Sequence, residues 1–292
     1  MSDMTRRGMG MAAALAAVGA GLVATSRTAQ AQAGKSTWER IQETKTLRTA
    51  APISEPFLWK DVTNSDKPGS VKVGDVLWRG LAVNVCKQLA DALDVKLEMV
   101  DTTYGNGVAG LQANQFDLIF ALDGTPKRAA VVDFVPQALL WYGTAILAKS
   151  GTAIDTWKAI DDAKLQIGVP VGTTMETEIM RRAPGAKLER FQNIPEMIAA
   201  FQAGRVGAIS SSLTGMTLAS ARLPNSIVAM PNPPALFPAT ASIRQELDPR
   251  WRNFLTTSFA YLANSGFVQN ALNEAYAFRG VDISKLQPVV IR

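Results

Sequence analysis

An arginine near the middle of the chain is well suited to bind a ligand. Arg128 ends the stretch TPKR (residues 125–128), at the N-terminal end of an expected helix. A planar guanidinium there offers two parallel donors, and the helix end adds a positive field, to a carboxylate. Taken alone, an arginine in a loop is more simply a solvated residue that caps a helix. The chemistry that this stretch could supply is carboxylate binding.

A second candidate anion site is the turn Gly172-Thr173-Thr174. It lies between the strand-like run LQIGVPV (residues 165–171) and an acidic helical segment. Free N–H groups at a helix start, together with two hydroxyl groups, can bind a carboxylate. A simpler role is that Thr173 or Thr174 caps the helix, and both roles can coexist.

The composition excludes several classes of enzyme site. The chain has no histidine and one cysteine, which rules out Ser-His-Asp triads, Cys-His pairs and histidine-rich metal sites. Cys86 lies in an apolar helical pattern, which indicates a small core residue. The formal net charge of +5, part of it in the first 33 residues, is too small to indicate a nucleic-acid partner. We expect no metal and no other cofactor.

The first 33 residues have the pattern of an export signal. Arg6 and Arg7 precede an apolar run over residues 9–25, and residues 29–31 and 31–33 offer small-residue cleavage sites. The paired arginines and the weakly hydrophobic segment suit the twin-arginine route, which exports folded proteins. An apolar run of about 17 residues is at the lower limit for a membrane span. We expect a cleaved signal and a periplasmic mature protein.

The elements that would position the candidate residues alternate between strands and helices. Strand-like runs such as TLRTAA (46–51) and FDLIFAL (116–122) are separated by amphipathic helical runs. This alternation indicates parallel sheets covered by helices. The pattern starts again near Ala153 without a flexible linker, so we expect two intimately joined lobes. A last helical stretch, 249–278, has a predicted break at Ser265-Gly266.

The Pro-rich segment 231–238 allows two interpretations. It could be a surface connection that proline holds extended. Alternatively, it is the second of two strands that cross between the lobes, the first lying near residues 142–148, and the two crossings form a hinge. The predicted lobes are residues 36–143 with 240–292, and residues 144–239.

The order of these segments resembles the extracellular solute-binding protein family 3, the polar amino-acid receptors of ABC importers. The most specific stretch is FDLIF (116–120), followed by TPKR (125–128) and VDF (132–134). The resemblance implies an α/β periplasmic-binding-protein fold of type II, with two lobes, each a mostly parallel sheet flanked by helices, and two hinge strands. It also implies a monomer that binds an amino acid or related small carboxylate and delivers it to an ABC importer permease.

The resemblance also implies roles for residues in both lobes. Arg128 stands where the family clamps the α-carboxylate of the ligand, and Thr173 and Thr174 stand where the opposite lobe binds the same group. Tyr104 falls where an aromatic side chain stacks on the ligand, although it is equally compatible with a plain loop residue. The remaining candidates for the ligand site are Phe57, Trp59, Thr125 and Ser212.

Two departures from the family pattern bear on the ligand. Asp123 stands where a serine or threonine is usual, and Ser212 stands where an aspartate receives the α-ammonium group. A buried ammonium without an acid is costly. Either Asp123 has taken over the ammonium, or the ligand has no α-amino group. Ala51 and Ser54 stand where receptors for basic amino acids carry an acid and an aromatic residue, so lysine and arginine are not expected as ligands.

Two other classes of protein share this scaffold. Cyclohexadienyl dehydratases, which act on prephenate or arogenate, resemble the family and use a glutamate soon after the Gly-Thr turn as general acid. Here Glu176 comes one residue later than in that pattern, with Met175 at the matching place, and on a first helical turn a carboxylate is more simply a partner of the helix dipole. A ligand-sensing domain would need a separate effector. We therefore predict ligand recognition without catalysis.

Overall fold

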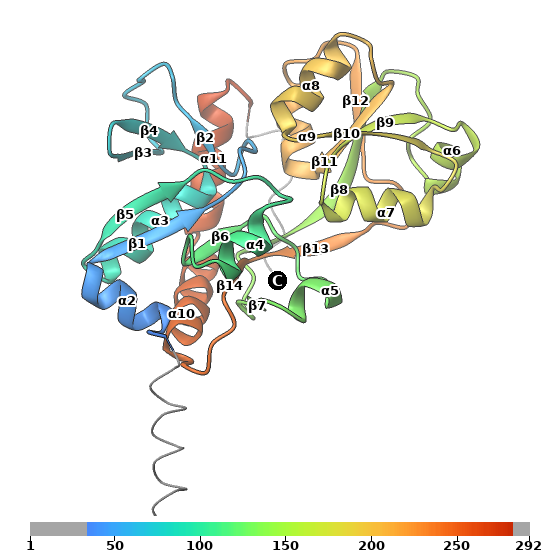
Figure 1. Ribbon diagram of the computed structural model, residues 1–292. Coiled ribbons are helices and arrows are strands. Elements are labelled where there is room, and N and C mark those ends of the chain that lie inside the picture. Colours follow the sequence, from blue (N-terminus) through green and yellow to red (C-terminus); the bar gives the residue numbers. More distant parts are fainter. Residues whose placement is uncertain (1–33, 283–292) are drawn as a thin grey trace, which may run out of the picture.

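This computed structural model describes residues 34–282 of the chain. They form two lobes, each built on a β-sheet that helices cover (Figure 1). The predicted export signal and the last ten residues lie outside this range. Within it, no helix combines the length and the apolar character that crossing a bilayer requires.

The first lobe contains a sheet with the strand order β5-β1-β6-β14-β7. β1 pairs in parallel with β5 and β6, whereas β14 is antiparallel to β6 and β7. Its strands are β1 (Thr46–Ala50), β5 (Lys96–Val100), β6 (Leu118–Phe120), β7 (Asp133–Phe134) and β14 (Ala241–Ile243). Its helices are α2 (Thr37–Thr44), α3 (Leu81–Ala92), α4 (Gly107–Gln112), α5 (Pro126–Ala129), α10 (Arg250–Asn264) and α11 (Phe267–Phe278).

The start of helix α3 fixes the loop that carries Phe57. Gly80 has φ +111°, and a Cβ there would lie 2.4 Å from the carbonyl oxygen of Phe57, so only glycine fits. The N–H groups of Leu81 and Ala82 donate to the carbonyl oxygens of Pro56 and Phe57 at 3.2 and 2.8 Å. These bonds use donors that a helix start leaves free, and they hold Phe57 against the helix.

A small antiparallel sheet stands beside this start. Its strands are β2 (Trp59–Lys60), β3 (Ser70–Val73) and β4 (Val76–Arg79), in the order β2-β4-β3. The apolar helical pattern around Cys86 extends back to Trp78 in the sequence, but Trp78 lies in β4 and the helix begins after Gly80. The positive φ of this glycine ends the strand and separates it from the helix.

The second lobe contains the sheet β10-β9-β11-β8-β12, in which β9 pairs in parallel with β10 and β11, and β8 is antiparallel to β11 and β12. Its strands are β8 (Leu140–Lys149), β9 (Gln166–Pro170), β10 (Lys187–Phe191), β11 (Ala208–Ser212), β12 (Ser226–Ala229) and β13 (Leu236–Ala239). Its helices are α6 (Trp157–Asp162), α7 (Thr174–Arg182), α8 (Ile194–Gln202) and α9 (Leu213–Ser220).

The two lobes are joined by a pair of antiparallel strands. β13 pairs with the first half of β8, from Leu236 opposite Gly143 to Ala239 opposite Leu140, and both run between the lobes in Figure 1. The Pro-rich segment thus ends in a crossing strand, as the second interpretation held. The predicted lobe boundaries, after residues 143 and 239, fall on these strands.

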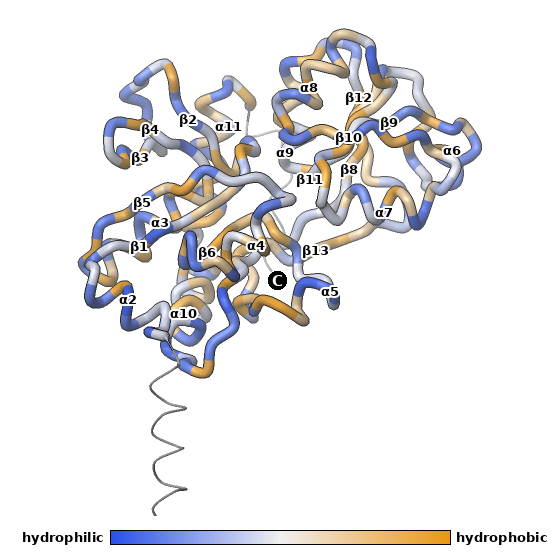
Figure 2. The backbone as a smooth tube through the Cα atoms, in the orientation of Figure 1, coloured by the Kyte–Doolittle hydropathy of each residue, from blue (hydrophilic) through white to orange (hydrophobic). Residues whose placement is uncertain are grey.

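Each sheet buries apolar side chains on both faces. In the second lobe, one core lies under α8 and α9 and the other under α6 and α7. In the first lobe, α3, α10 and α11 cover the larger core and α4 the smaller one. The predicted break between the last two helices is confirmed, since Gly266 has φ +82° between α10 and α11. Figure 2 shows hydrophobic residues along the central strands and hydrophilic residues on the outer loops.

Candidate functional site

A cavity lies between the two lobes, and residues from both line it. Strand β6 of the first lobe and strands β9 and β11 of the second end there, which brings the carboxyl ends of both sheets to one place. Six of the residues proposed from sequence line this cavity: Phe57, Tyr104, Asp123, Arg128, Thr173 and Ser212. Among the described residues, no cluster of acidic and cysteine side chains is arranged to hold a metal ion.

Asp123 joins the two lobes inside this cavity. Its side chain is buried, and one carboxylate oxygen accepts a hydrogen bond from the Tyr142 hydroxyl while the other accepts one from the Thr174 hydroxyl of the opposite lobe. Burial raises the pKa of the Asp123 carboxyl, while the hydrogen bonds from Thr174 and Tyr142 and the charge of Arg128 act in the opposite direction. The charged form of Asp123 is therefore held at a cost.

Arg128 follows Asp123 by five residues and reaches across the cavity to Gly172 of the second lobe. Its main-chain N–H donates to the Thr125 hydroxyl, which caps helix α5, at 3.3 Å. Its guanidinium donates through Nη1 to the carbonyl oxygen of Asp123 at 3.0 Å and through Nη2 to that of Gly172 at 2.5 Å. Within residues 34–282, no salt bridge involves Arg128 or Asp123. Both charges thus line one cavity without an ion-pair partner.

The threonine turn of the second lobe lies where the sequence analysis placed it. The Thr173 hydroxyl donates to the Pro170 carbonyl oxygen at 2.8 Å and accepts from the Glu176 N–H, so Thr173 caps helix α7. Thr174 points to Asp123 and is absent from the cavity lining. Gly172 has φ +76°, and a Cβ there would come within 3.4 Å of Gly105 in the opposite lobe. A side chain at this position would press on the loop that carries Tyr104.

The aromatic candidates separate into two groups. Phe57 and Tyr104 line the cavity, and the ring of Phe57 lies 6.5 Å from that of Tyr142. Burial raises the pKa of Tyr104 to about 12, so its hydroxyl stays neutral. Trp59 lies elsewhere: it packs against Phe278, with 6.0 Å between ring centroids, and does not line the cavity.

The polar candidates Thr125 and Ser212 have local partners. Thr125 caps α5 and is not part of the cavity lining. Ser212 ends β11 at the cavity and caps α9, because its hydroxyl accepts from the Gly215 N–H at 3.2 Å. The structure therefore brings six of the nine proposed residues to the cavity, adds Thr174 as a cross-lobe partner of Asp123, and places Trp59 and Thr125 outside.

Glu176, the residue considered as a general acid, has both oxygens engaged. One accepts from the Gly172 N–H at 2.9 Å and the other from the Arg190 guanidinium at 2.5 Å. The side chain stands behind the turn and does not line the cavity. This arrangement fits a carboxylate that steadies the helix start better than one that donates a proton to a ligand.

Comparison with known proteins agrees with this architecture. The family model of the bacterial extracellular solute-binding proteins, family 3, matches residues 62–276. The chain belongs to this family. No curated protein matches the sequence.

Solved structures of other solute-binding proteins have the same fold. A mutant of ArgBP from T. maritima has a TM-score of 0.70 and 19% identity, with 83% of this chain and 100% of that chain covered. An amino acid ABC transporter substrate-binding protein from Streptococcus pneumoniae, bound to L-arginine, has a TM-score of 0.72 and 21% identity, over 83% and 98% of the two chains. The ancestral amino acid-binding protein AncCDT-1, a precursor of cyclohexadienyl dehydratase, has a TM-score of 0.67 and 24% identity, over 84% and 99%.

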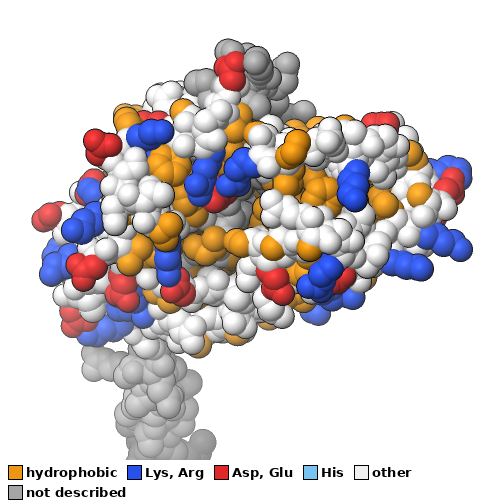
Figure 3. Space-filling model, turned by 90° about the horizontal axis from the view of Figure 1, so that it is seen from above, with side chains coloured by type: hydrophobic (Ala, Val, Ile, Leu, Met, Phe, Trp, Pro, Cys, Tyr) orange, Lys and Arg blue, Asp and Glu red, His pale blue; other side chains and the backbone are white. Residues whose placement is uncertain are grey.

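This solute-binding protein has a second set of cross-lobe contacts, near a groove that Ile53 and Glu55 of the first lobe line together with residues of α8 and α9. Glu55 of the first lobe forms an ion pair with Arg222, just after α9 in the second lobe, at 3.1 Å, and another with Arg279 of its own lobe. The Tyr276 hydroxyl donates to the carbonyl oxygen of Thr214 at 3.1 Å. In Figure 3, basic and acidic side chains meet beside the hollow between the lobes.

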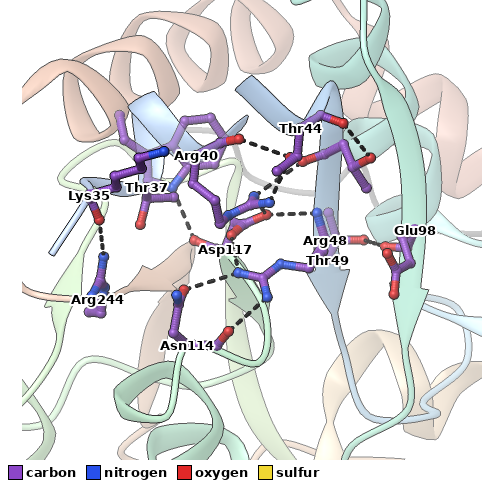
Figure 4. A network of polar contacts seen from close by, with 12 residues as sticks. Lys35, Thr37, Arg40, Thr44, Arg48, Thr49, Glu98, Asn114, Asp117 and Arg244 are labelled. Atoms are coloured by element: carbon purple, nitrogen blue, oxygen red, sulfur yellow. Dashed lines mark hydrogen bonds and ion pairs between the residues drawn. The ribbon is translucent and has the colours of Figure 1, made fainter. Parts of the chain in front are cut away.

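The acid of the FDLIF stretch, Asp117, has a structural role in this solute-binding protein. Asp117 is buried at the start of β6, at the opposite end of that strand from Asp123. Figure 4 shows it between Arg40 and Arg48, and the latter donates through its N–H at 2.7 Å and through Nη2 at 2.9 Å. The network ties α2 and β1 to β6.

Tyr142 and Met175 are among the lining residues of the cavity that were not proposed from sequence. Tyr142 was assigned only to a strand, yet its hydroxyl binds Asp123, and Met175 was noted only for its place next to Glu176, yet it lines the cavity. Tyr142 follows Leu140 at a spacing of two, which puts it on the same side of β8. That spacing indicated which way the Tyr142 side chain points, but it could not identify Asp123 as its partner.

Proposed function

We propose that this family 3 protein is the receptor of an ABC importer, binding an amino acid in the cavity between its lobes and delivering it to a membrane permease. The observation that carries the proposal is the pair of opposite charges, Arg128 and Asp123, which line one cavity and have no ion-pair partner in the described part of the chain. An amino acid is a zwitterion and can complement both. The amino acid ABC transporter substrate-binding protein bound to L-arginine, with a similar fold, supports this class of ligand.

In this proposal, Arg128 receives the ligand's carboxylate. Its guanidinium now donates to two neutral carbonyl oxygens, and a hydrogen bond to a carboxylate is roughly twice as strong as one to a neutral acceptor. The N-terminus of helix α7, nine residues long, points to the same cavity through Thr173 and Met175. Its first N–H groups have no partner within the helix, and they approach the carboxylate from the second lobe.

Asp123 receives the ligand's ammonium group. A carboxylate has about four acceptor positions, and the hydroxyls of Tyr142 and Thr174 use two of them. A cation beside Asp123 also offsets the cost of burying its charge. Ser212, at the place where the family aspartate is expected, offers only a hydroxyl that already caps a helix. The carboxylate of Asp123, free to accept an ammonium group, therefore favours an amino acid over a deaminated acid.

Occupancy of the cavity favours the closed arrangement of the lobes. Asp123 to Thr174 and Arg128 to Gly172 are both contacts between lobes, and a ligand that binds Arg128, Asp123 and the start of α7 adds further bridges. Such a ligand stabilises the closed state by its extra affinity for that state. The closed, loaded protein is then the form that the permease recognises. We place this step in the periplasm, with the receptor as a monomer.

Thermal unfolding of the mature protein tests the proposal. The protein is unfolded and refolded to remove carried-over ligand, then heated with each L-amino acid or with its 2-oxo or 2-hydroxy counterpart. A ligand at about a hundred times its dissociation constant adds about 2.7 kcal/mol of stability, a shift of several degrees. We expect shifts with amino acids only.

A variant at Arg128 provides the control for the carboxylate site. Arg128→Lys keeps the charge but loses the planar pair of donors, so we expect the shift with amino acids to shrink or disappear. Arg181→Lys, on the exposed face of α7, should behave as the wild type. Shifts with deaminated acids alone would refute the amino-acid ligand, and release of carbon dioxide and water from prephenate would refute a receptor without catalysis.

A further inference from the structure

We infer that the side chain of the ligand is uncharged and apolar, so that the receptor selects aliphatic or aromatic amino acids. This inference rests on the proposed function and deepens it. It follows from what remains in the cavity once Arg128 and Asp123 have bound the ligand's main-chain groups.

The cavity offers no second charge. Among the described residues that line it, Asp123 and Arg128 are the only charged ones. A ligand with a lysine or arginine side chain would bury a cation without a carboxylate, and one with a glutamate side chain would bury an anion without a cation. Either arrangement is strongly unfavourable, because an isolated charge loses its hydration without a replacement.

The hydroxyl groups around the cavity are largely engaged within the protein. Thr173 donates to Pro170 at 2.8 Å, and Thr240 donates to the carbonyl oxygen of Val135, also at 2.8 Å. Tyr142 donates to Asp123, and Tyr104 is hydrogen-bonded to Ser54. These bonds hold the donors that a polar side chain would need, so a polar ligand gains little from them.

What faces the remaining space is apolar. The lining contains aromatic, aliphatic and thioether side chains from both lobes, among them Phe57, Leu81, Phe120, Leu139, Met175 and Pro238. Phe57 and Phe120 come from the first lobe and Met175 from the second, so a ligand side chain between them is covered from both sides. Burial of apolar surface then supplies the discrimination, at about fourfold in affinity for each methylene group.

Calorimetric titration with matched ligands tests the inference. Norleucine and lysine have side chains of nearly equal length that differ by a terminal charged amine. We expect norleucine to bind at least a hundredfold more tightly than lysine, glutamine more tightly than glutamate, and affinity to rise along the series alanine, 2-aminobutyrate and norvaline. Equal or tighter binding of lysine or glutamate would overturn the inference and leave the amino-acid receptor intact. Failure of every amino acid, alanine included, would overturn the proposed function as well.

Two methionines on helix α7 provide a matched pair of variants. Met175 lines the cavity and is buried, whereas Met180 is exposed on the same helix. Met175→Ala should weaken norleucine binding by about tenfold, with a smaller effect on alanine, and Met180→Ala should bind both as the wild type does. Unchanged norleucine affinity in Met175→Ala would overturn the placement of the side chain against this wall.

Discussion

Asp123 is the residue at which stability and the proposed function are opposed in this protein. Its carboxyl is buried between Tyr142 and Thr174, and burial raises its pKa. A carboxyl whose folded pKa is raised contributes stability that is fully present below the unfolded pKa, near 3.8, and is lost as the pH rises through the folded pKa. The ionised form of Asp123 thus lowers the stability of the unliganded protein, and in the proposed function a ligand's ammonium group offsets that cost.

The substitution Asp123→Asn separates these two effects. It removes the buried charge and keeps an oxygen that can accept one of the two hydroxyls, so we expect the unliganded variant to unfold at a higher temperature than the wild type at pH 7. Its affinity for amino acids should fall by about a hundredfold, because the ammonium loses its charged partner. Thermal unfolding and calorimetry measure the two quantities. A variant that binds amino acids as the wild type does would disprove the role of Asp123.

The same carboxyl predicts the pH dependence of binding. An ammonium beside Asp123 favours its charged form, so binding lowers the pKa that burial has raised. Amino-acid affinity should therefore weaken as the pH falls through the pKa of Asp123 in the unliganded protein. Titrations at several pH values measure this slope, and Asp123→Asn should not show it. A slope that persists in the variant would assign the titrating group elsewhere.

At the scale of the elements, Asp123 follows a strand, β6, whose start is held by residues of other elements. Asp117 anchors the start of β6 to α2 and β1, while Asp123 follows its end. Trp251 of α10 donates to the carbonyl oxygen of Asp117 at 3.0 Å, which adds a helix from the other end of the chain. The network thus fixes the start of the strand whose other end leads to Asp123.

Asp117→Asn tests this structural role. The change leaves the guanidinium groups of Arg40 and Arg48 partly buried without their carboxylate, which we expect to destabilise the protein by about 3 kcal/mol. Unfolding in urea measures the loss. Asp101→Asn, at an exposed residue paired with Lys60, should change stability by less than about 1 kcal/mol. The ligand affinity of folded Asp117→Asn should match the wild type, and a large loss of affinity at full stability would place Asp117 in the binding site instead.

Elements were predicted from sequence where a local signal fixed them. The strand-like runs at 46–51 and 116–122 and the helix break at Gly266 match β1, β6 and the start of α11, because a short apolar run and a glycine are local signals. The small sheet was missed, since strand β4 runs directly into helix α3 and only Gly80 separates them. Local periodicity does not show where such a change of element occurs.

The family resemblance and the two-lobed fold, with its two crossing strands, are confirmed at the scale of the whole molecule. The contacts between lobes were not readable from sequence. Thr174 lies 51 residues from Asp123, and Arg222 lies 167 residues from Glu55. Such pairs depend on how the two lobes meet. Neither the spacing nor the composition of either segment indicates that arrangement.

The groove contacts predict a variant that shifts the balance between closed and open lobes. Arg222→Gln removes the ion pair that joins Glu55 to the second lobe, whereas Arg279→Gln removes one within the first lobe. Because the pair is partly exposed, we expect the open-to-closed ratio to rise by no more than about fivefold. The radius of gyration of the unliganded protein, from X-ray scattering, should increase for Arg222→Gln only. An equal increase in both variants would show that the cross-lobe pair has no special part in closure.

A crystal structure of the mature protein with its tightest-binding amino acid tests the central claim most directly. We predict that the ligand's carboxylate binds the guanidinium of Arg128, that its ammonium group binds the carboxylate of Asp123, and that its side chain lies against Phe57 and Met175. A ligand found outside this cavity, or bound inside it without contact to Arg128 and Asp123, would contradict the account.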